Sequence, residues 1–91
     1  MYLEIISPEA ILFKGEVDSV SVPGLNGYFQ VLNNHAPIVS SLKKGKVEIK
    51  GDIQIDKEFE KIFEKSEGKT ILKIDSGTIE MRNNRVIVLS D

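Results

Sequence analysis

The sequence has no cysteine, no tryptophan and a single histidine, and its aromatic residues are four phenylalanines and two tyrosines. Without cysteine, the chain has no disulfide, no thiolate nucleophile and no cysteine-based zinc site. Sugar-binding platforms need exposed aromatic rings, for which the chain offers only Tyr2 and Tyr28. These absences remove many of the residue types from which small enzymes and carbohydrate-binding modules are built.

An excess of positive charge and long hydrophobic runs are also missing. The formal net charge is −2, whereas nucleic-acid binders need a basic face to neutralise phosphates. No apolar run approaches the roughly 20 residues that cross a bilayer, and residues 1–8 carry no basic segment of the kind that opens a signal peptide. We therefore expect no nucleic-acid partner and no direct membrane insertion, so that any work at a membrane would depend on a protein partner.

The pattern that is present is an alternation with a period of two residues. Successive side chains of a strand point to opposite faces, so alternation predicts short strands with one buried face. Many short strands separated by frequent turns are typical of a sandwich or barrel. A length of 91 residues suits one domain. We predict an all-β fold, a single domain over residues 1–91 built as a flattened β-sandwich or barrel of about eight to ten short, mostly antiparallel strands. The alternating apolar pairs are Leu3 and Ile5, Val20 and Val22, Phe29 and Val31, Val47 and Ile49, Ile79 and Met81, and Val86 and Val88.

Turn residues lie between these alternating segments. Asn83 and Asn84 separate two of them by two residues, and asparagine tolerates positive φ, so this pair predicts a tight hairpin. The structural turns that we predict are at Gly15, Pro23, Gly24, Gly27, Gly45, Gly77, Asn83 and Asn84.

Residues 51–69 interrupt the alternation with six acidic and four basic side chains. Phe59, Ile62 and Phe63 have the i, i+3, i+4 spacing that places side chains on one face of a helix. As a strand, the same segment would place Phe59 and Phe63 on one face and Ile62 on the other. We favour a charged excursion with a short helix near residues 57–65, or an irregular conformation there.

No motif in the sequence predicts catalysis. His35 has no acid or nucleophile near it in a recognisable pattern, so a loop imidazole bonded to backbone or solvent is the better interpretation. Residues 23–27 are glycine-rich, but a strand and not a helix follows them, unlike a phosphate-binding loop. We predict no catalytic, cofactor or metal site. The charged clusters read as solvated surface: Glu58, Glu60, Glu64 and Glu67 among lysines, and Lys43, Lys44, Lys46 and Lys50.

Residues 23–37 read Pro-Gly-Leu-Asn-Gly-Tyr-Phe-Gln-Val-Leu-Asn-Asn-His-Ala-Pro. This stretch resembles the signature of the epsilon subunit of F-type ATP synthase (the delta subunit in mitochondria). In that family a Pro-Gly turn and a second glycine precede a short strand and then a His-Ala-Pro loop. The resemblance covers nearly the whole chain except residues 51–69, and it continues in residues 3–9, 13–17, 47–49, 76–81 and 84–91.

The resemblance implies a β-sandwich of about ten strands with no catalytic residue and no cofactor. In the family, this domain binds the gamma subunit and rests on the polar loops of the c-ring, which couples ion flow to ATP synthesis. The resemblance therefore implies a rotor subunit on the cytoplasmic face of the bacterial inner membrane, held there by the complex. We expect the gamma contact on an apolar patch, because stable interfaces need a desolvated core. By position, the predicted c-ring contact residues are Tyr28, Asn34, His35, Ala36, Pro37 and Ile38.

The sequence departs from the family pattern at several points. Gln30 stands where the family usually has glycine, Asn33 stands where it often has proline, and residues 51–69 are longer than the usual connection. The sequence ends at Asp91, where many members continue into a C-terminal helical hairpin that inhibits ATP hydrolysis. We expect a short form that couples without inhibition through such a hairpin.

Two other classes of protein stay open from the sequence. A stand-alone β-sandwich that binds a sugar or peptide would present exposed aromatic side chains. A small enzyme would bring an acid, a base and a nucleophile together.

Overall fold

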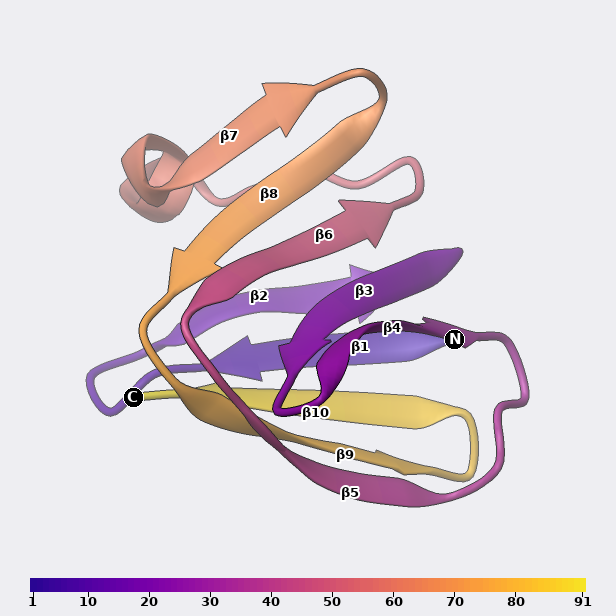
Figure 1. Cartoon of the computed structure of the whole chain (residues 1–91). Coiled ribbons are helices and arrows are strands. Elements are labelled where there is room, and N and C mark those ends of the chain that lie inside the picture. Colours follow the sequence, from indigo (N-terminus) through magenta and orange to yellow (C-terminus); the bar gives the residue numbers. More distant parts are fainter.

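The computed structural model describes all residues 1–91 and contains ten strands and one short 3₁₀ helix. Figure 1 shows the strands curling around a common centre. In chain order, the elements are β1 (Tyr2–Ile6), β2 (Ile11–Glu16), β3 (Ser19–Gly24), β4 (Gly27–Leu32), β5 (Ile38–Leu42), β6 (Gly45–Lys50), η1 (Lys57–Ile62), β7 (Phe63–Ser66), β8 (Lys69–Ile74), β9 (Gly77–Arg82) and β10 (Arg85–Ser90).

The strands form two layers that share one continuous ladder. One layer has the order β2-β1-β10-β9-β5, and the other contains β3, β6, β8 and β7 with β4 paired to β3. Only one residue pair, Gly24 with Leu42, joins β3 to β5 and so connects the layers. All strand pairs are antiparallel except β1 with β10. In Figure 1 the chain passes between the layers at the short connections β5–β6 and β8–β9.

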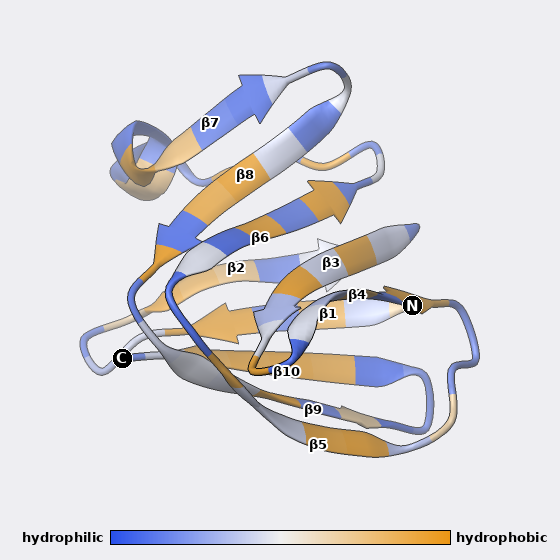
Figure 2. Cartoon of the chain, in the orientation of Figure 1, coloured by the Kyte–Doolittle hydropathy of each residue, from blue (hydrophilic) through white to orange (hydrophobic).

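The space between the layers is filled by the inward-facing set of alternating side chains. Figure 2 shows apolar and polar residues alternating along β6, as expected for a strand with one buried face. The prediction of an all-β sandwich-like fold is confirmed. The core contains nineteen buried hydrophobic residues, among them Leu3, Ile5, Val20, Val22, Val31, Val47, Ile49, Ile79, Met81, Val86 and Val88.

The predicted turn positions include one two-residue connection. Asn83 and Asn84 join β9 to β10 with φ of 51° and 60°, which is the left-handed conformation that such a hairpin requires. The other predicted turn residues flank turns or lie inside strands. Pro23 and Gly24 end β3, and Gly27, Gly45 and Gly77 begin strands.

Gly15 is a correction, because it lies within β2 and not in a turn. It pairs with Leu3 of β1. A Cβ added to Gly15 would lie 3.2 Å from the tip of the Phe13 ring. A glycine inside a strand can mark such a close approach and not only a turn.

The 51–69 segment combines both alternatives considered above. A helix lies within the predicted range, at residues 57–62, but it is a 3₁₀ helix and residues 63–66 form strand β7. Phe63 is buried and Phe59 packs against the core, while Ile62 is exposed. The burial of these three side chains therefore follows the strand alternative. Glu67 and Gly68 both have positive φ and close a second tight hairpin, between β7 and β8.

Candidate interaction surfaces

The six predicted contact residues fall into two groups that the structure keeps apart. Residues 34–37 form an exposed loop, and Ile38 begins β5. Tyr28 is the second residue of β4. Because a strand rises about 3.3 Å per residue, roughly 16 Å of β4 separates Tyr28 from the loop.

The 34–37 loop is held in one conformation by hydrogen bonds. The amide of His35 donates to the carbonyl of Leu32 at 3.1 Å, which closes a turn. Asn34 occupies this turn with φ of 60°, a conformation that asparagine tolerates better than most residues. The following Pro37 fixes its own φ. The loop therefore has a defined conformation and is not a flexible connection.

Asn84 ties three segments of the chain together. Its side-chain oxygen accepts from the amide of Asn34 at 2.7 Å, and its side-chain nitrogen donates to Oδ1 of Asn33 at 2.9 Å. Its carbonyl accepts from the amide of Tyr2 at 3.1 Å. The amino group of Met1 also donates to Oδ1 of Asn33, at 3.2 Å. The sequence alone indicates only a turn at Asn84, because Asn33 and Asn34 lie about fifty residues away in the chain.

The imidazole of His35 is exposed and makes a local contact. Its Nδ1 lies 2.7 Å from the carbonyl oxygen of Ala36. A carbonyl can only accept, so this contact requires a proton on Nδ1 and leaves Nε2 facing outward. No acid or nucleophile of the chain hydrogen-bonds to the ring.

We expect Asn84→Gly to loosen the 34–37 loop. Glycine accepts the positive φ of this position, so the change removes mainly the two side-chain hydrogen bonds, at about 0.5–1.5 kcal/mol each. Hydrogen exchange at the Asn34 amide should become faster. Asn83→Gly is the matched control, because Asn83 has the same kind of φ and none of these hydrogen bonds. Equal exchange at Asn34 in both variants would show that Asn84 does not hold the loop.

Tyr28 is held across the outer side of the neighbouring strands. Its hydroxyl accepts a hydrogen bond from the amide of Lys46 at 2.8 Å. A Cβ on Gly45 would lie 2.6 Å from this hydroxyl and 2.7 Å from Pro23. Gly45 is therefore required by the close approach of the Tyr28 hydroxyl and Pro23. The tyrosine remains 54% exposed, so it covers β6 and still faces solvent.

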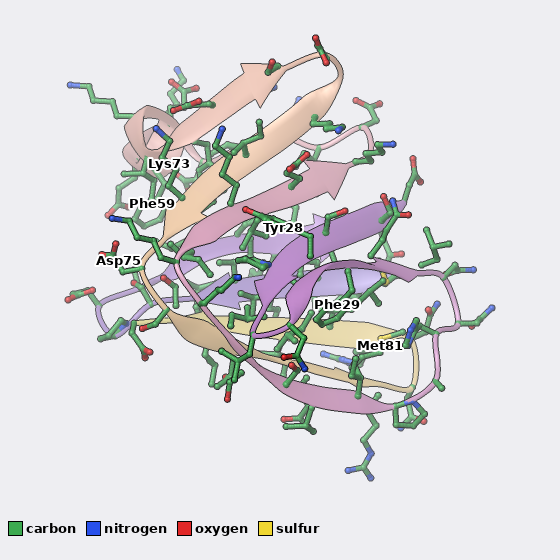
Figure 3. The ribbon with its side chains drawn as sticks, in the orientation of Figure 1. Tyr28, Phe29, Phe59, Lys73, Asp75 and Met81 are labelled. Atoms are coloured by element: carbon green, nitrogen blue, oxygen red, sulfur yellow. The ribbon has the colours of Figure 1, made fainter.

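The β3–β4 hairpin carries further exposed apolar residues that no sequence motif indicates. Leu25 lies in its two-residue turn, and Leu32 lies at the end of β4 with its side chain on the same outward face as Tyr28. In Figure 3, Phe29 and Met81 instead reach into the space between the layers. The alternation of β4 thus divides a core side from an apolar outer side.

A second apolar surface lies on the outer face of the other layer. We define the aliphatic patch as Ile6, Ile11, Ile87 and Leu89. Ile6 stands beside Ile11 on β2 and beside Leu89 on β10, and Ile87 is the next outward residue of β10. Ile11 is 48% exposed and Leu89 is 45% exposed. Four neighbouring aliphatic side chains on one sheet face are a feature of interaction sites.

No group of three or more histidine, aspartate or glutamate residues is placed to hold a metal ion. The only helix has six residues, and nothing in the structure is a helix long and apolar enough to span a bilayer. What the surface does offer is a fixed loop and two apolar faces on a sheet with a continuous core. These features belong to an all-β domain with exposed apolar surface of the kind that often marks contacts with other proteins.

The comparisons with known proteins identify the family of this domain. The family described as ATP synthase, Delta/Epsilon chain, beta-sandwich domain matches residues 1–91. The chain is 39% identical over 89 residues to the ATP synthase epsilon chain of Leptospira interrogans, an alignment that covers 98% of this chain and 59% of that protein. It is 44% identical over 89 residues to the epsilon chain of Chlorobaculum tepidum, covering 98% and 86%. The chain belongs to the ATP synthase delta/epsilon chain family, and the resemblance seen in the sequence is confirmed.

Solved structures agree on the fold. The central stalk and c-ring structure of the Tetrahymena thermophila mitochondrial ATP synthase contains a chain that matches with a TM-score of 0.75 at 10% identity, covering 99% of this chain and 62% of that one. A chain of the Euglena gracilis mitochondrial enzyme matches with a TM-score of 0.71 at 20% identity, covering 97% and 48%.

The relatives also bear on the enzyme question. Epsilon chains are non-catalytic stalk subunits, so kinship confirms the prediction that the chain is not itself an enzyme. The chain spans about three fifths of the length of the Leptospira relatives.

Proposed function

We propose that this chain is a non-catalytic subunit of the central stalk of a proton-translocating bacterial ATP synthase. In this role it binds the gamma subunit, contacts the c-ring and so couples ion flow to ATP synthesis. The complex holds it at the cytoplasmic face of the inner membrane. The observation that carries this proposal is the aliphatic patch on a domain that belongs to the delta/epsilon family.

The aliphatic patch is the proposed contact for the gamma subunit. Its four members stand on three adjacent strands, so they move as one surface with the sheet. Polar side chains border it, with Glu4 and Lys14 facing one another across β1 and β2. An apolar centre with a polar rim is the usual anatomy of a stable protein interface. Backbone pairing on both sides of β1 and β10 gives the surface the stiffness that transmission of torque requires.

The proposed c-ring contact consists of the 34–38 segment and the outer side of the β3–β4 hairpin. These two points are roughly 16 Å apart along β4. Helices pack at 8–10 Å, so the loops of a ring of hairpins repeat at a comparable spacing. Two contact points at this separation therefore suit a ring that presents the same loop many times. His35 and Pro37 would supply one point, and Leu25 and Tyr28 the other.

A pair of matched substitutions tests both contacts. We expect Leu89→Asp to weaken binding of the gamma subunit by at least about 30-fold, because it places a charge in the desolvated centre of the interface. Leu25→Asp should leave gamma binding unchanged and lower proton-driven ATP synthesis in the assembled complex. Binding is measured by titration with purified gamma subunit, after circular dichroism has shown that both variants are folded. Wild-type gamma affinity in the Leu89 variant would refute the assignment of the patch.

A further inference from the structure

The outer face of β6 and β8 carries lysines in an arrangement that the apolar contacts do not explain. We define the lysine face as Lys43, Lys44, Lys46, Lys50, Lys69 and Lys73. The four on strands point outward, because Val47, Ile49, Leu72 and Ile74 of the same strands are buried. Glu48, Glu64 and Asp75 lie among these lysines, and Asp52 and Glu67 lie beside Lys69 at the far end. Six lysines against five carboxylates leave a positive excess, in a chain whose formal net charge is −2.

Two pairs of lysines oppose each other across the strands. Lys46 is the partner of Lys73, and Lys50 is the partner of Lys69. Like charges directly opposite in an antiparallel pair destabilise a sheet. The carboxylates relieve only one member of each pair, since Glu48 bonds Lys69 at 3.2 Å and Glu64 lies 3.5 Å from Lys73.

Lys46 and Lys50 have no carboxylate within ion-pair distance. Like charges that face each other across strands with no carboxylate to neutralise them are a local conflict, and such conflicts are a sign of a functional surface.

The donors converge at one end of this face. Lys44, Lys46 and Lys73 line a shallow cavity of about 400 Å³ together with Gly45 and Ile74, and Asp75 is its one acidic residue. Figure 3 shows Lys73 and Asp75 at the end of β8 from which the chain leaves for β9.

The hydroxyl of Tyr28 adds a donor to the same end of the face. It reaches Gly45 and accepts from the Lys46 amide. Its own hydrogen has no protein acceptor. Ammonium groups can only donate, and this O–H offers one further donor, so the site favours an anion with several acceptor atoms.

We propose that the lysine face binds an acidic, extended segment of a partner protein, with one carboxylate in the cavity beside Lys46 and Lys73. Residues 43–50 carry lysines over roughly 23 Å of chain, which is longer than a small phosphate ligand and matches an extended peptide. The face has no arginine, since Arg82 and Arg85 lie on β9 and β10. Tyr28 is its only aromatic residue, so the base stacking that single-stranded nucleic acids need is missing. This inference does not rest on the proposed role in the synthase.

A titration of the ¹⁵N-labelled chain tests the proposal. The probe is a capped hexaglutamate peptide at about 20 mM salt, where surface charges are weakly screened. We expect saturable shifts centred on the amides of Lys46 and Lys73. Lys46→Gln should weaken the binding about three- to tenfold, as expected for the loss of a charged hydrogen bond. Lys61→Gln, in the exposed helix η1, should leave it unchanged.

A second readout separates a binding role from a structural one. Lys46→Glu removes one like-charge pair, so it should raise the Tm by a few degrees while abolishing hexaglutamate binding.

Several results would overturn the proposal. One is shifts spread evenly over all exposed lysines, and another is a Lys46→Gln variant that binds like wild type. A third is tighter Lys46-dependent binding of tripolyphosphate, of anionic phosphatidylglycerol vesicles or of oligothymidylate, which would assign the face to another class of ligand.

Discussion

Gly77→Ala should cost the domain about 3 kcal/mol or more of its free energy of unfolding. Gly77 begins β9 and pairs with both Leu42 and Ser90, so the sheet encloses it on two sides. A Cβ there would overlap the carbonyl oxygen of Leu89. Because that atom belongs to the backbone of the β9–β10 ladder, relief requires movement of the strands and not of a side chain.

The matched control is Gly15→Ala. Gly15 also lies in a strand, but its Cβ would meet only the end of the Phe13 ring, at 3.2 Å. We expect a cost within about 1 kcal/mol there, since a ring can shift slightly. For a domain of this size, the 3 kcal/mol change corresponds to roughly 12–24 °C in Tm. Chemical denaturation measures both variants, and equal losses would show that the β9–β10 contact is not as tight as described.

Ile5→Ala should destabilise the domain by about 2–5 kcal/mol, which is a large part of the 5–15 kcal/mol typical of such domains. Ile5 is fully buried in the middle of β1, between Phe13 of β2 and Val88 of β10. Truncation leaves a cavity at the centre of the layer that supports the aliphatic patch. The free energy of unfolding is measured by urea denaturation. An unchanged dependence of this free energy on urea concentration would show that unfolding remains two-state.

Ile11→Ala removes the same atoms from an exposed site on the next strand. About half of the Ile11 surface is already in water, so we expect a loss below about 1 kcal/mol. The two substitutions should also separate stability from binding. Ile11→Ala should weaken gamma binding in a stable domain, whereas Ile5→Ala should weaken stability first. Similar unfolding free energies in the two variants would contradict the placement of the Ile5 side chain in the core and of the Ile11 side chain on the outer face.

The alternating pattern predicted the fold because alternation reports burial directly. Leu3 and Ile5 of β1 are buried, and so are Val86 and Val88 of β10, as their spacing indicated. The tolerance of Asn83 and Asn84 for positive φ is a property of these residues themselves, so the sequence alone was enough to locate that hairpin. Strand β7 escaped prediction, because its residues 63–66 include Glu64 and Lys65 and only Phe63 is buried. A short, charged edge strand shows little alternation.

The interaction surfaces depend on pairing between distant segments, which the sequence does not display. The aliphatic patch exists because β1 lies parallel to β10, so that Ile6 meets Leu89 across most of the chain's length. Asn84 holds the 34–37 loop through the same kind of long-range contact. The sequence predicted the six c-ring contact residues as one group, yet the length of β4 separates Tyr28 from the others. In each case the pairing and length of the strands, and not the composition, determine which residues lie together.

The absence of cysteine allows a direct test of the central claim, which is that the outer face of β1, β2 and β10 docks on the gamma subunit. Leu89→Cys and Lys65→Cys each provide one exposed thiol, on the aliphatic patch and on β7 of the opposite layer. Maleimide labelling is measured in the free chain and in its complex with gamma. We predict that gamma suppresses labelling at position 89 and leaves labelling at position 65 unchanged. Equal labelling at position 89 in both states would contradict the account.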